Sequence, residues 1–177
     1  VANSVFDGTD ALMLSVETAI GRFPVEAVTA MARIAERAEA ALPYDRMLDE
    51  RERTLERNTA EAIALASVRA AETLGAAVIV AATTTGSTAL RVARFRPHRP
   101  ILALTTSEAT LRRLRLVWGV HPVVMPEVRE FDEVIAAAQD AVRRTGLARS
   151  GDDIVVTAGY PMGQPGTTNL LKVVRVE

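Results

Sequence analysis

The stretch 83–88 reads Thr-Thr-Thr-Gly-Ser-Thr, so hydroxyl side chains occupy every position except Gly86. It follows the apolar run 76–82, and this order predicts a tight turn from a buried strand into a helix near 88–96. Ser87 or Thr88 can cap that helix by accepting hydrogen bonds from its free backbone N–H groups. Hydroxyls, unpaired N–H groups and the positive end of a helix dipole attract phosphate or carboxylate. The same residues also fit a plain capped turn. The anion-binding candidates here are Thr83, Thr84, Thr85, Gly86, Ser87 and Thr88.

Two other loops follow predicted strands, and ligands of open α/β sheets collect at the carboxyl ends of strands. The loop 105–107 is Thr-Thr-Ser, which we interpret mainly as a helix cap. The loop 159–169 is rich in glycine and includes Gly166, Thr167 and Thr168. It either folds over the turn at 83–88 and closes an anion site, or it is a long hairpin turn that needs glycine.

Charged and titratable side chains give weaker signals. Arg91 and Arg94 stand three residues apart, so they can share a helix face near the same pocket. Since 20 of the 21 basic residues are arginines, such a pair is weak evidence. We interpret His98 and His121, which lie beside prolines, as structural or exposed. Ser15, Glu17 and Thr18 form a polar cluster that fits either a barrel active-site rim or a capped turn.

The elements that must position these residues alternate regularly after residue 58. Asn58 and Glu61 have capping-box spacing and start a helix that Gly75 ends, with a predicted buried stripe at 63, 66, 70 and 74. Strands and helices then follow in turn, which predicts an α/β fold with right-handed crossovers. We expect a mostly parallel five-stranded sheet with helices on both faces and an antiparallel edge strand. The predicted strands are 76–82, 101–104, 123–125, 153–157 and 170–176.

The first part of the chain has a different organisation. Residues 11–14 predict a short buried strand whose pairing partners are missing nearby in the sequence, and residues 24–42 predict an amphipathic helix that Pro43 ends. The charged segment 44–57 predicts a solvated connector between two domains. We therefore divide the chain into 1–43, 44–57 and 58–177.

Composition narrows the function classes. The 177 residues carry a net charge of −1, which argues against nucleic-acid or membrane-surface binding by bulk electrostatics. With no cysteine and two histidines there is little material for disulfides or zinc. The sequence shows no signal peptide and no apolar run long enough for a bilayer, so we expect a cytoplasmic protein. Because the chain begins with Val1, we expect it to be a piece of a longer protein.

One motif is highly specific. Residues 7–28 read DGTDALMLSVETAIGRFPVEAV and closely resemble the DGxDAxMLSGETAxGxYPxEAV signature of pyruvate kinases. Residues 83–89 match the family's TxSGxTA loop, and residues 154–177 resemble its C-terminal strand pair. This resemblance implies the last strand and helix of a (β/α)8 barrel in residues 1–43, followed by the family's C-terminal α/β domain. Val16 departs from the signature because the family usually has glycine there.

The resemblance also implies a function. Pyruvate kinases transfer a phosphoryl group from phosphoenolpyruvate to ADP with Mg²⁺ and usually K⁺. In the family, the metal-binding carboxylates and the essential lysine come from earlier barrel strands, so we expect this chain alone to be inactive and to contain no cofactor site. Ser15 and Thr18 would form only a rim of the active site.

The resemblance further implies a regulatory and assembly role. The family's C-terminal domain builds a tetramer interface and often binds a sugar phosphate or nucleotide. From composition, as above, we expect no nucleic-acid and no membrane partner. By position, that site would use residues 83–88, closed by Gly166 and Thr167. Two alternatives stay open: a free-standing domain that senses sugar phosphates or nucleotides, and a purely structural oligomerisation module.

Overall fold

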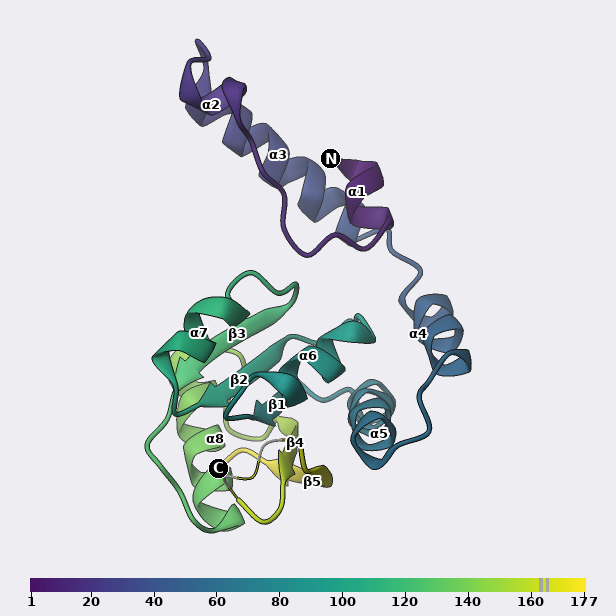
Figure 1. Cartoon of the computed structure of the whole chain (residues 1–177), viewed down its shortest axis with the longest axis vertical. Helices are drawn as coiled ribbons and strands as arrows, with labels where there is room; N and C mark the ends of the chain where they lie inside the picture. Colours follow the sequence, from purple (N-terminus) through teal and green to yellow (C-terminus); the bar gives the residue numbers. More distant parts are fainter. Residues whose placement is uncertain (163, 165) are drawn as a thin grey trace. The chain divides into compact units, whose positions relative to one another are not determined.

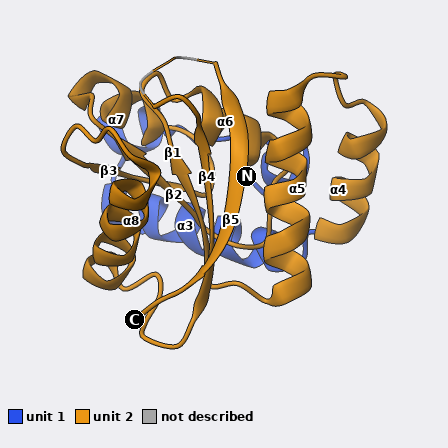
Figure 2. Ribbon diagram, turned by 90° about the horizontal axis from the view of Figure 1, so that it is seen from below, with its two compact units in different colours: residues 1–43 blue, residues 44–177 orange. Residues whose placement is uncertain are grey.

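The computed structural model describes residues 1–162, 164 and 166–177 (Figure 1). The chain divides into two compact units, residues 1–43 and residues 44–177 (Figure 2). The first unit contains three helices: α1 (Ala2–Phe6), α2 (Val16–Ala19) and α3 (Pro24–Glu39).

The long helix α3 confirms the helix predicted from residue 24, with Pro24 in its first turn, where a missing N–H costs nothing. The predicted strand at 11–14 is wrong for this structure, because these residues pair with no strand and Met13 is 88% exposed. An isolated strand leaves its backbone groups without partners, so it does not form without neighbours. Large apolar side chains such as Phe23 and Val25 are exposed on this unit.

The second unit is an α/β structure built on one five-stranded sheet. Its helices are α4 (Tyr44–Arg53), α5 (Thr59–Leu74), α6 (Ser87–Arg94), α7 (Glu108–Leu114) and α8 (Phe131–Thr145). Its strands are β1 (Val78–Ala82), β2 (Ile101–Thr105), β3 (Val120–Val124), β4 (Asp153–Gly159) and β5 (Thr168–Arg175). The strand order is β3-β2-β1-β4-β5, in which only β5 runs antiparallel to its neighbour. The predicted fold class is confirmed.

Two apolar cores hold the sheet between its helices. Alternate residues of β1 point to opposite faces, so Ile79 packs with the helices α5, α6 and α7 while Val80 packs with α8. Figure 2 shows α8 on one side of the sheet and α5 on the other. Each fully buried Val or Ile stabilises the fold by about 1.5–3 kcal/mol relative to exposure. These two layers fix the positions of the loops at the strand ends.

Helix α5 begins as predicted but buries a different face. The Asn58 side chain accepts a hydrogen bond from the Glu61 backbone at 2.9 Å, and Gly75 ends the helix at φ +65°. The buried stripe is Ala60, Ala64, Ser67, Val68 and Ala71, whereas Leu74 is 52% exposed. The predicted stripe was wrong because alanines lie on every side of this helix, and apolar spacing then fails to select one face.

The charged segment 44–57 differs from the solvated connector that the sequence predicts. Residues 44–53 form α4, and its Leu48 is only 4% exposed and belongs to the apolar core. The guanidinium of Arg69 on α5 bonds to Asp49 at 2.5 Å and to Glu52 at 2.6 Å. One buried leucine and one bridging arginine therefore attach an otherwise charged helix to the second unit.

Candidate functional site

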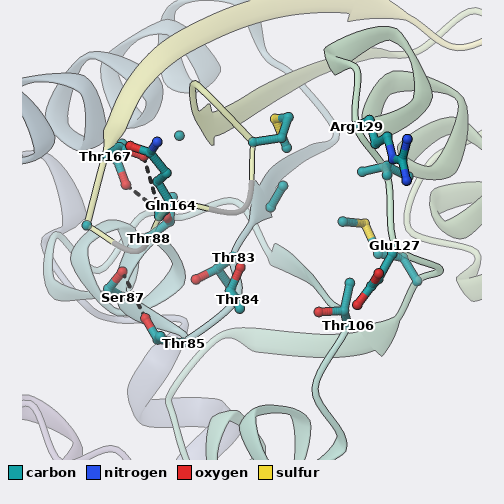
Figure 3. Close-up of a pocket in the computed structure, with 17 residues that line it drawn as sticks. Thr83, Thr84, Thr85, Ser87, Thr88, Thr106, Glu127, Arg129, Gln164 and Thr167 are labelled. Carbon is teal, nitrogen blue, oxygen red and sulfur yellow. Dashed lines mark hydrogen bonds between the residues drawn. The ribbon is translucent and has the colours of Figure 1, made fainter.

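A cavity of about 540 Å³ lies at the carboxyl ends of the strands, where the loops after β1, β2, β3 and β4 meet (Figure 3). This is the edge at which open α/β sheets bind ligands. The cavity is lined by Ala82, Thr83, Thr84, Thr85, Ser87 and Thr88 after β1, by Thr106 after β2, by Met125, Glu127, Val128 and Arg129 after β3, and by Gly159, Met162, Gln164, Gly166, Thr167 and Thr168 between and within β4 and β5.

A hydrogen bond inside the turn after β1, together with a glycine in it, fixes the shape of this turn. Thr83 is 8% exposed, and its hydroxyl oxygen accepts a hydrogen bond from the Gly86 backbone N–H at 2.9 Å. Gly86 has φ +90°, a conformation that costs little only for glycine, and a Cβ there would lie 3.3 Å from the Leu114 side chain. These constraints explain why the single glycine stands at this position.

The predicted cap of the following helix was wrong. Helix α6 begins at Ser87 with Gly86 as its N-cap, and no side chain caps it. Glycine has no side chain to cap with, and Thr88 bonds elsewhere, so the first-turn N–H groups stay available. The backbone N–H groups of Ser87 and Thr88 donate no hydrogen bond to any acceptor in the part of the chain that the structure describes. Thr84 and Thr85 are exposed, and Ser87 is half-buried.

The loop between β4 and β5 reaches the helix that follows β1. The Thr88 and Thr168 hydroxyl oxygens lie 2.8 Å apart, and both residues are buried. The side-chain amide of Asn169 bonds to the Tyr160 backbone in both directions, at 2.7 and 2.8 Å. Gly166 and Thr167 of this loop line the same cavity as the turn at 83–88. Gly163 and Pro165 of the same loop lie outside the described residues.

The loop after β2 caps the helix that follows it and also lines the cavity. The Ser107 hydroxyl accepts a hydrogen bond from the Thr110 backbone at 3.2 Å, so the predicted cap of α7 is confirmed. Thr106 lines the cavity and is exposed. The Thr84 carbonyl accepts a hydrogen bond from the Thr110 hydroxyl at 3.0 Å, which ties the turn after β1 to α7.

The segment after β3 was missed by the sequence reasoning. Glu127 and Arg129 line the cavity, and Figure 3 shows them across it from Thr85 and Ser87. The signal was available, because this segment also follows the carboxyl end of a parallel strand. Its lack of glycines and of a hydroxyl cluster hid it.

Arg91 and Arg94 are not at the cavity. Both turn toward α5, where Nε of Arg91 and Nη1 of Arg94 each lie 3.4 Å from an oxygen of the buried Glu61 carboxylate. Their predicted role near an anion pocket is therefore wrong, and their shared helix face instead joins α6 to α5. His98 contacts the Tyr44 ring edge-on with centroids 4.9 Å apart, and His121 is exposed on β3.

Ser15 and Thr18 lie in the first unit and are not part of this cavity. The Thr18 hydroxyl donates to the Ser15 carbonyl at 3.2 Å, and Glu17 accepts from the Ser15 backbone at 3.1 Å. Hydrogen bonds from the backbone N–H groups of Glu17 and Ser15 lower the pKa of the Glu17 carboxyl. Val16 lies in α2, outside the positive-φ residues, so its backbone does not require glycine here.

Within the described residues, no three His, Cys, Asp or Glu side chains are grouped to hold a metal ion. No helix in the same residues combines the length and apolar character that a bilayer span requires.

Fold and site together define a class of protein: an α/β domain with a hydroxyl-lined cavity beyond the carboxyl ends of a mostly parallel sheet. Comparison with known families is more specific. The pyruvate kinase alpha/beta domain matches residues 61–174, and the pyruvate kinase barrel domain matches residues 1–28. The chain belongs to the pyruvate kinase family, and the resemblance seen in the sequence is confirmed.

Individual relatives agree with this assignment. The chain is 46% identical over 177 residues to a pyruvate kinase of Clostridium acetobutylicum and 47% identical over 173 residues to one of Geobacillus stearothermophilus. It covers 37% and 30% of these proteins, which in turn align with 100% and 98% of the chain. The structure of Cryptosporidium parvum pyruvate kinase in complex with ADP matches with a TM-score of 0.86 at 34% identity, covering 99% of this chain and 36% of that one. The chain thus spans about a third of the length of these relatives.

Proposed function

We propose that this chain is the C-terminal part of a pyruvate kinase that transfers a phosphoryl group from phosphoenolpyruvate to ADP, and that its second unit binds a phosphate-bearing effector. The family match over residues 61–174 supports the first part. The barrel-domain match over residues 1–28 supports a role for the first unit as a piece of the catalytic barrel. The chain alone would not catalyse the reaction, because in the family the metal-binding carboxylates and the essential lysine come from earlier barrel strands.

The observation that carries the effector site is the combination of hydroxyls and free N–H groups around one cavity. Thr84, Thr85 and Ser87 face the cavity from one loop, and Thr167 faces it from another. The N-terminus of α6 opens onto the same space with N–H groups that have no intrahelical partner. A phosphate accepts several hydrogen bonds from such donors, and the helix dipole adds about 0.3–1 kcal/mol to its binding.

The remaining parts of the proposal follow from the family. Mg²⁺ and K⁺ would act in the barrel of the whole enzyme, and the second unit would contribute to a homo-oligomer, which is a tetramer in the family. The protein would work in glycolysis in the cytoplasm. The effector would be a sugar phosphate or a nucleotide bound by the turn at 83–88, of which every residue except Gly86 lines the cavity, together with Gly166 and Thr167.

A charge placed at the start of α6 tests the phosphate site. In Ser87→Asp, the carboxylate repels a phosphate while favouring the positive end of the helix, so the fold is retained. We expect the affinity for glucose 6-phosphate, measured by calorimetry, to fall by more than about tenfold. The matched control Ser87→Asn has nearly the same shape without the charge and should bind more tightly than Ser87→Asp. Equal affinities of both variants and the unmodified chain would contradict the site.

A further inference from the structure

Helix α8 has two faces that carry different residues. One face packs on the sheet through buried residues such as Val134, Ala138 and Val142. The second face follows the helical spacing of three and four residues, and it carries Glu133, Ala136, Ala137, Asp140, Ala141 and Arg144. This second face forms one wall of a groove of about 410 Å³. No described residue of α8 lines the cavity at the strand ends, so the groove is a separate feature.

The opposite wall of the groove is the end of β3 together with the segment that follows it. Val124, Pro126 and Val128 give this wall an apolar surface, and Val124 is 39% exposed. The Met125 backbone donates to the Thr105 carbonyl at 2.9 Å, which attaches the wall to β2. The capping box at the start of α8 holds the far end of the same segment. The groove is therefore preformed, which lowers the entropic cost of binding a partner.

The spacing along α8 sets the size of a partner. From Glu133 to Arg144 the face extends about 17 Å along the helix axis, since each residue adds about 1.5 Å. This length matches about three turns of another helix. Ala136 and Ala137 lie in the middle of the face, and their small side chains allow a second helix to pack at an interaxial distance of about 8–10 Å.

An extended peptide is a poorer fit than a helix. Strand β3 lies at the edge of the sheet and pairs with β2 alone, so an extended peptide would bind by adding a strand to its free edge. The backbones of Gly119 and Met125 bond to β2, and alternate residues of a strand share an edge, so Pro122 turns its backbone toward the free edge. Proline has no N–H to donate to an added strand, and strand addition is disfavoured.

The charges of the groove select a basic partner. Glu127, Glu133 and Asp140 supply three carboxylates, whereas Arg144 supplies one guanidinium, which lies 3.5 Å from Asp140. The Glu130 backbone N–H donates to the Glu133 carboxyl and lowers its pKa, so this group is negatively charged at neutral pH. Lysine or arginine side chains of a partner complement such a rim.

We propose that the groove between β3 and α8 is a docking surface for a partner protein that presents an amphipathic helix, with apolar residues along one face and Lys or Arg beside them. The apolar face of the partner helix packs on Val124, Ala136 and Ala137, and its basic side chains pair with Glu133 and Asp140. This docking does not depend on the proposed phosphate site, because none of these α8 residues lines that cavity.

The test uses a synthetic peptide of about 15 residues, capped at both ends, in which leucines occupy one helical face and arginines flank them. Calorimetry measures its binding to the full 177-residue chain. We expect saturable binding at micromolar peptide. A peptide of the same composition in scrambled order should bind at least about tenfold more weakly, because it has no continuous apolar face.

Two variants separate helix docking from attraction between charges alone. Asp140→Lys reverses one charge on the rim and should weaken binding of the peptide at least about tenfold. Ala136→Glu adds a negative charge but fills the space in which the partner helix packs, and Ala136 is exposed, so the chain still folds. We expect this variant to weaken binding about fivefold or more. Equal or tighter binding to Ala136→Glu would mean that charge alone attracts the peptide, and would overturn the inference.

The matched control is Asp132→Lys, the same charge change on a side chain of α8 that is 93% exposed and does not line the groove. It should leave the affinity within about twofold, and urea denaturation checks that each variant is folded. Absence of peptide binding, equal binding of the scrambled peptide, or full binding to Asp140→Lys would contradict the proposal. Self-association of the unmodified chain that Asp140→Lys abolishes would assign the groove to a second copy, and would overturn the proposal as well.

Discussion

The hydroxyl oxygens of Thr88 and Thr168 lie 2.8 Å apart although 80 residues separate them in the sequence. Thr88 belongs to the first turn of α6, and Thr168 begins β5. Both residues are buried, at 4% and 2% exposure. This contact connects the start of α6 to the start of β5, next to the two segments that contribute most of the hydroxyls to the cavity.

Replacing one of these threonines by valine keeps the shape of the side chain but leaves the other hydroxyl buried without its partner. We expect Thr88→Val and Thr168→Val each to lower the free energy of unfolding by about 1–2 kcal/mol. The double variant should lose less than the sum, because no orphaned hydroxyl remains. Urea denaturation of the four proteins measures this coupling, and strictly additive losses would show that the two hydroxyls do not depend on each other.

Glu61 is a buried carboxylate between Arg91 and Arg94, with a side-chain exposure of 6%. Its replacement by glutamine removes the charge that compensates two guanidinium groups. Since those groups are 31% and 44% exposed, water offsets part of the loss, and we expect Glu61→Gln to destabilise the chain by about 1–3 kcal/mol.

The control for Glu61 is Glu50→Gln on α4. Its ion pair with Arg46 is exposed, so the change in unfolding free energy should stay within about 0.5 kcal/mol. If both glutamine variants unfold at the same urea concentration, Glu61 does not hold α6 against α5.

The start of α8 predicts a pH dependence. Hydrogen bonds from the backbone N–H groups of Glu130 and Arg129 lower the pKa of the Glu133 carboxyl below its ordinary value of 4.5. A lowered pKa in the folded state adds stability above the unfolded pKa, and this stability is lost as the pH falls through the folded pKa. Below pH 4.5, we therefore expect the unmodified chain to lose more stability than Glu133→Gln. Parallel stability curves of the two proteins between pH 6 and about pH 3 would contradict this role.

Gly159 allows the loop between β4 and β5 to approach closely. A Cβ at this position would lie 2.5 Å from the Thr167 hydroxyl oxygen and 3.1 Å from its backbone carbonyl atoms. Gly159→Ala must displace Thr167, so we expect a loss of about 1–3 kcal/mol in stability and weaker binding of glucose 6-phosphate. Adding Thr167→Ala removes the nearer contact and should restore part of the stability. No recovery in the double variant would mean that the clash lies elsewhere.

Much of the fold could be predicted from the sequence because its strands are uniform apolar runs and its helices have clear ends. Asn58 and Gly75 bound α5 as expected, and the sheet with its antiparallel edge strand is confirmed. Prediction failed where the local pattern was ambiguous. The alanine-rich helix α5 buries a different stripe from the one predicted. The charged segment that was expected to be a solvated connector forms α4, which Leu48 anchors to the apolar core. The segment 11–14 fits a strand in composition but has no partner strand.

The site was only partly predictable. The hydroxyl cluster at 83–88 and the loop that carries Gly166 and Thr167 do line one cavity. Arg91 and Arg94 were misplaced because helical spacing gives a shared face but not what that face packs against. Glu127 and Arg129 reach the cavity through the tertiary arrangement of β3 and α8, which no local motif signals.

The central claim is that the cavity beside α6 binds phosphate through hydroxyls and backbone N–H groups. Amide NMR of the ¹⁵N-labelled chain during a titration with glucose 6-phosphate tests it most directly. We predict saturable shifts of the amide signals of Thr84, Thr85, Ser87 and Thr88, together with Gly166 and Thr167. Shifts confined to other residues, or no shifts at millimolar ligand, would contradict it.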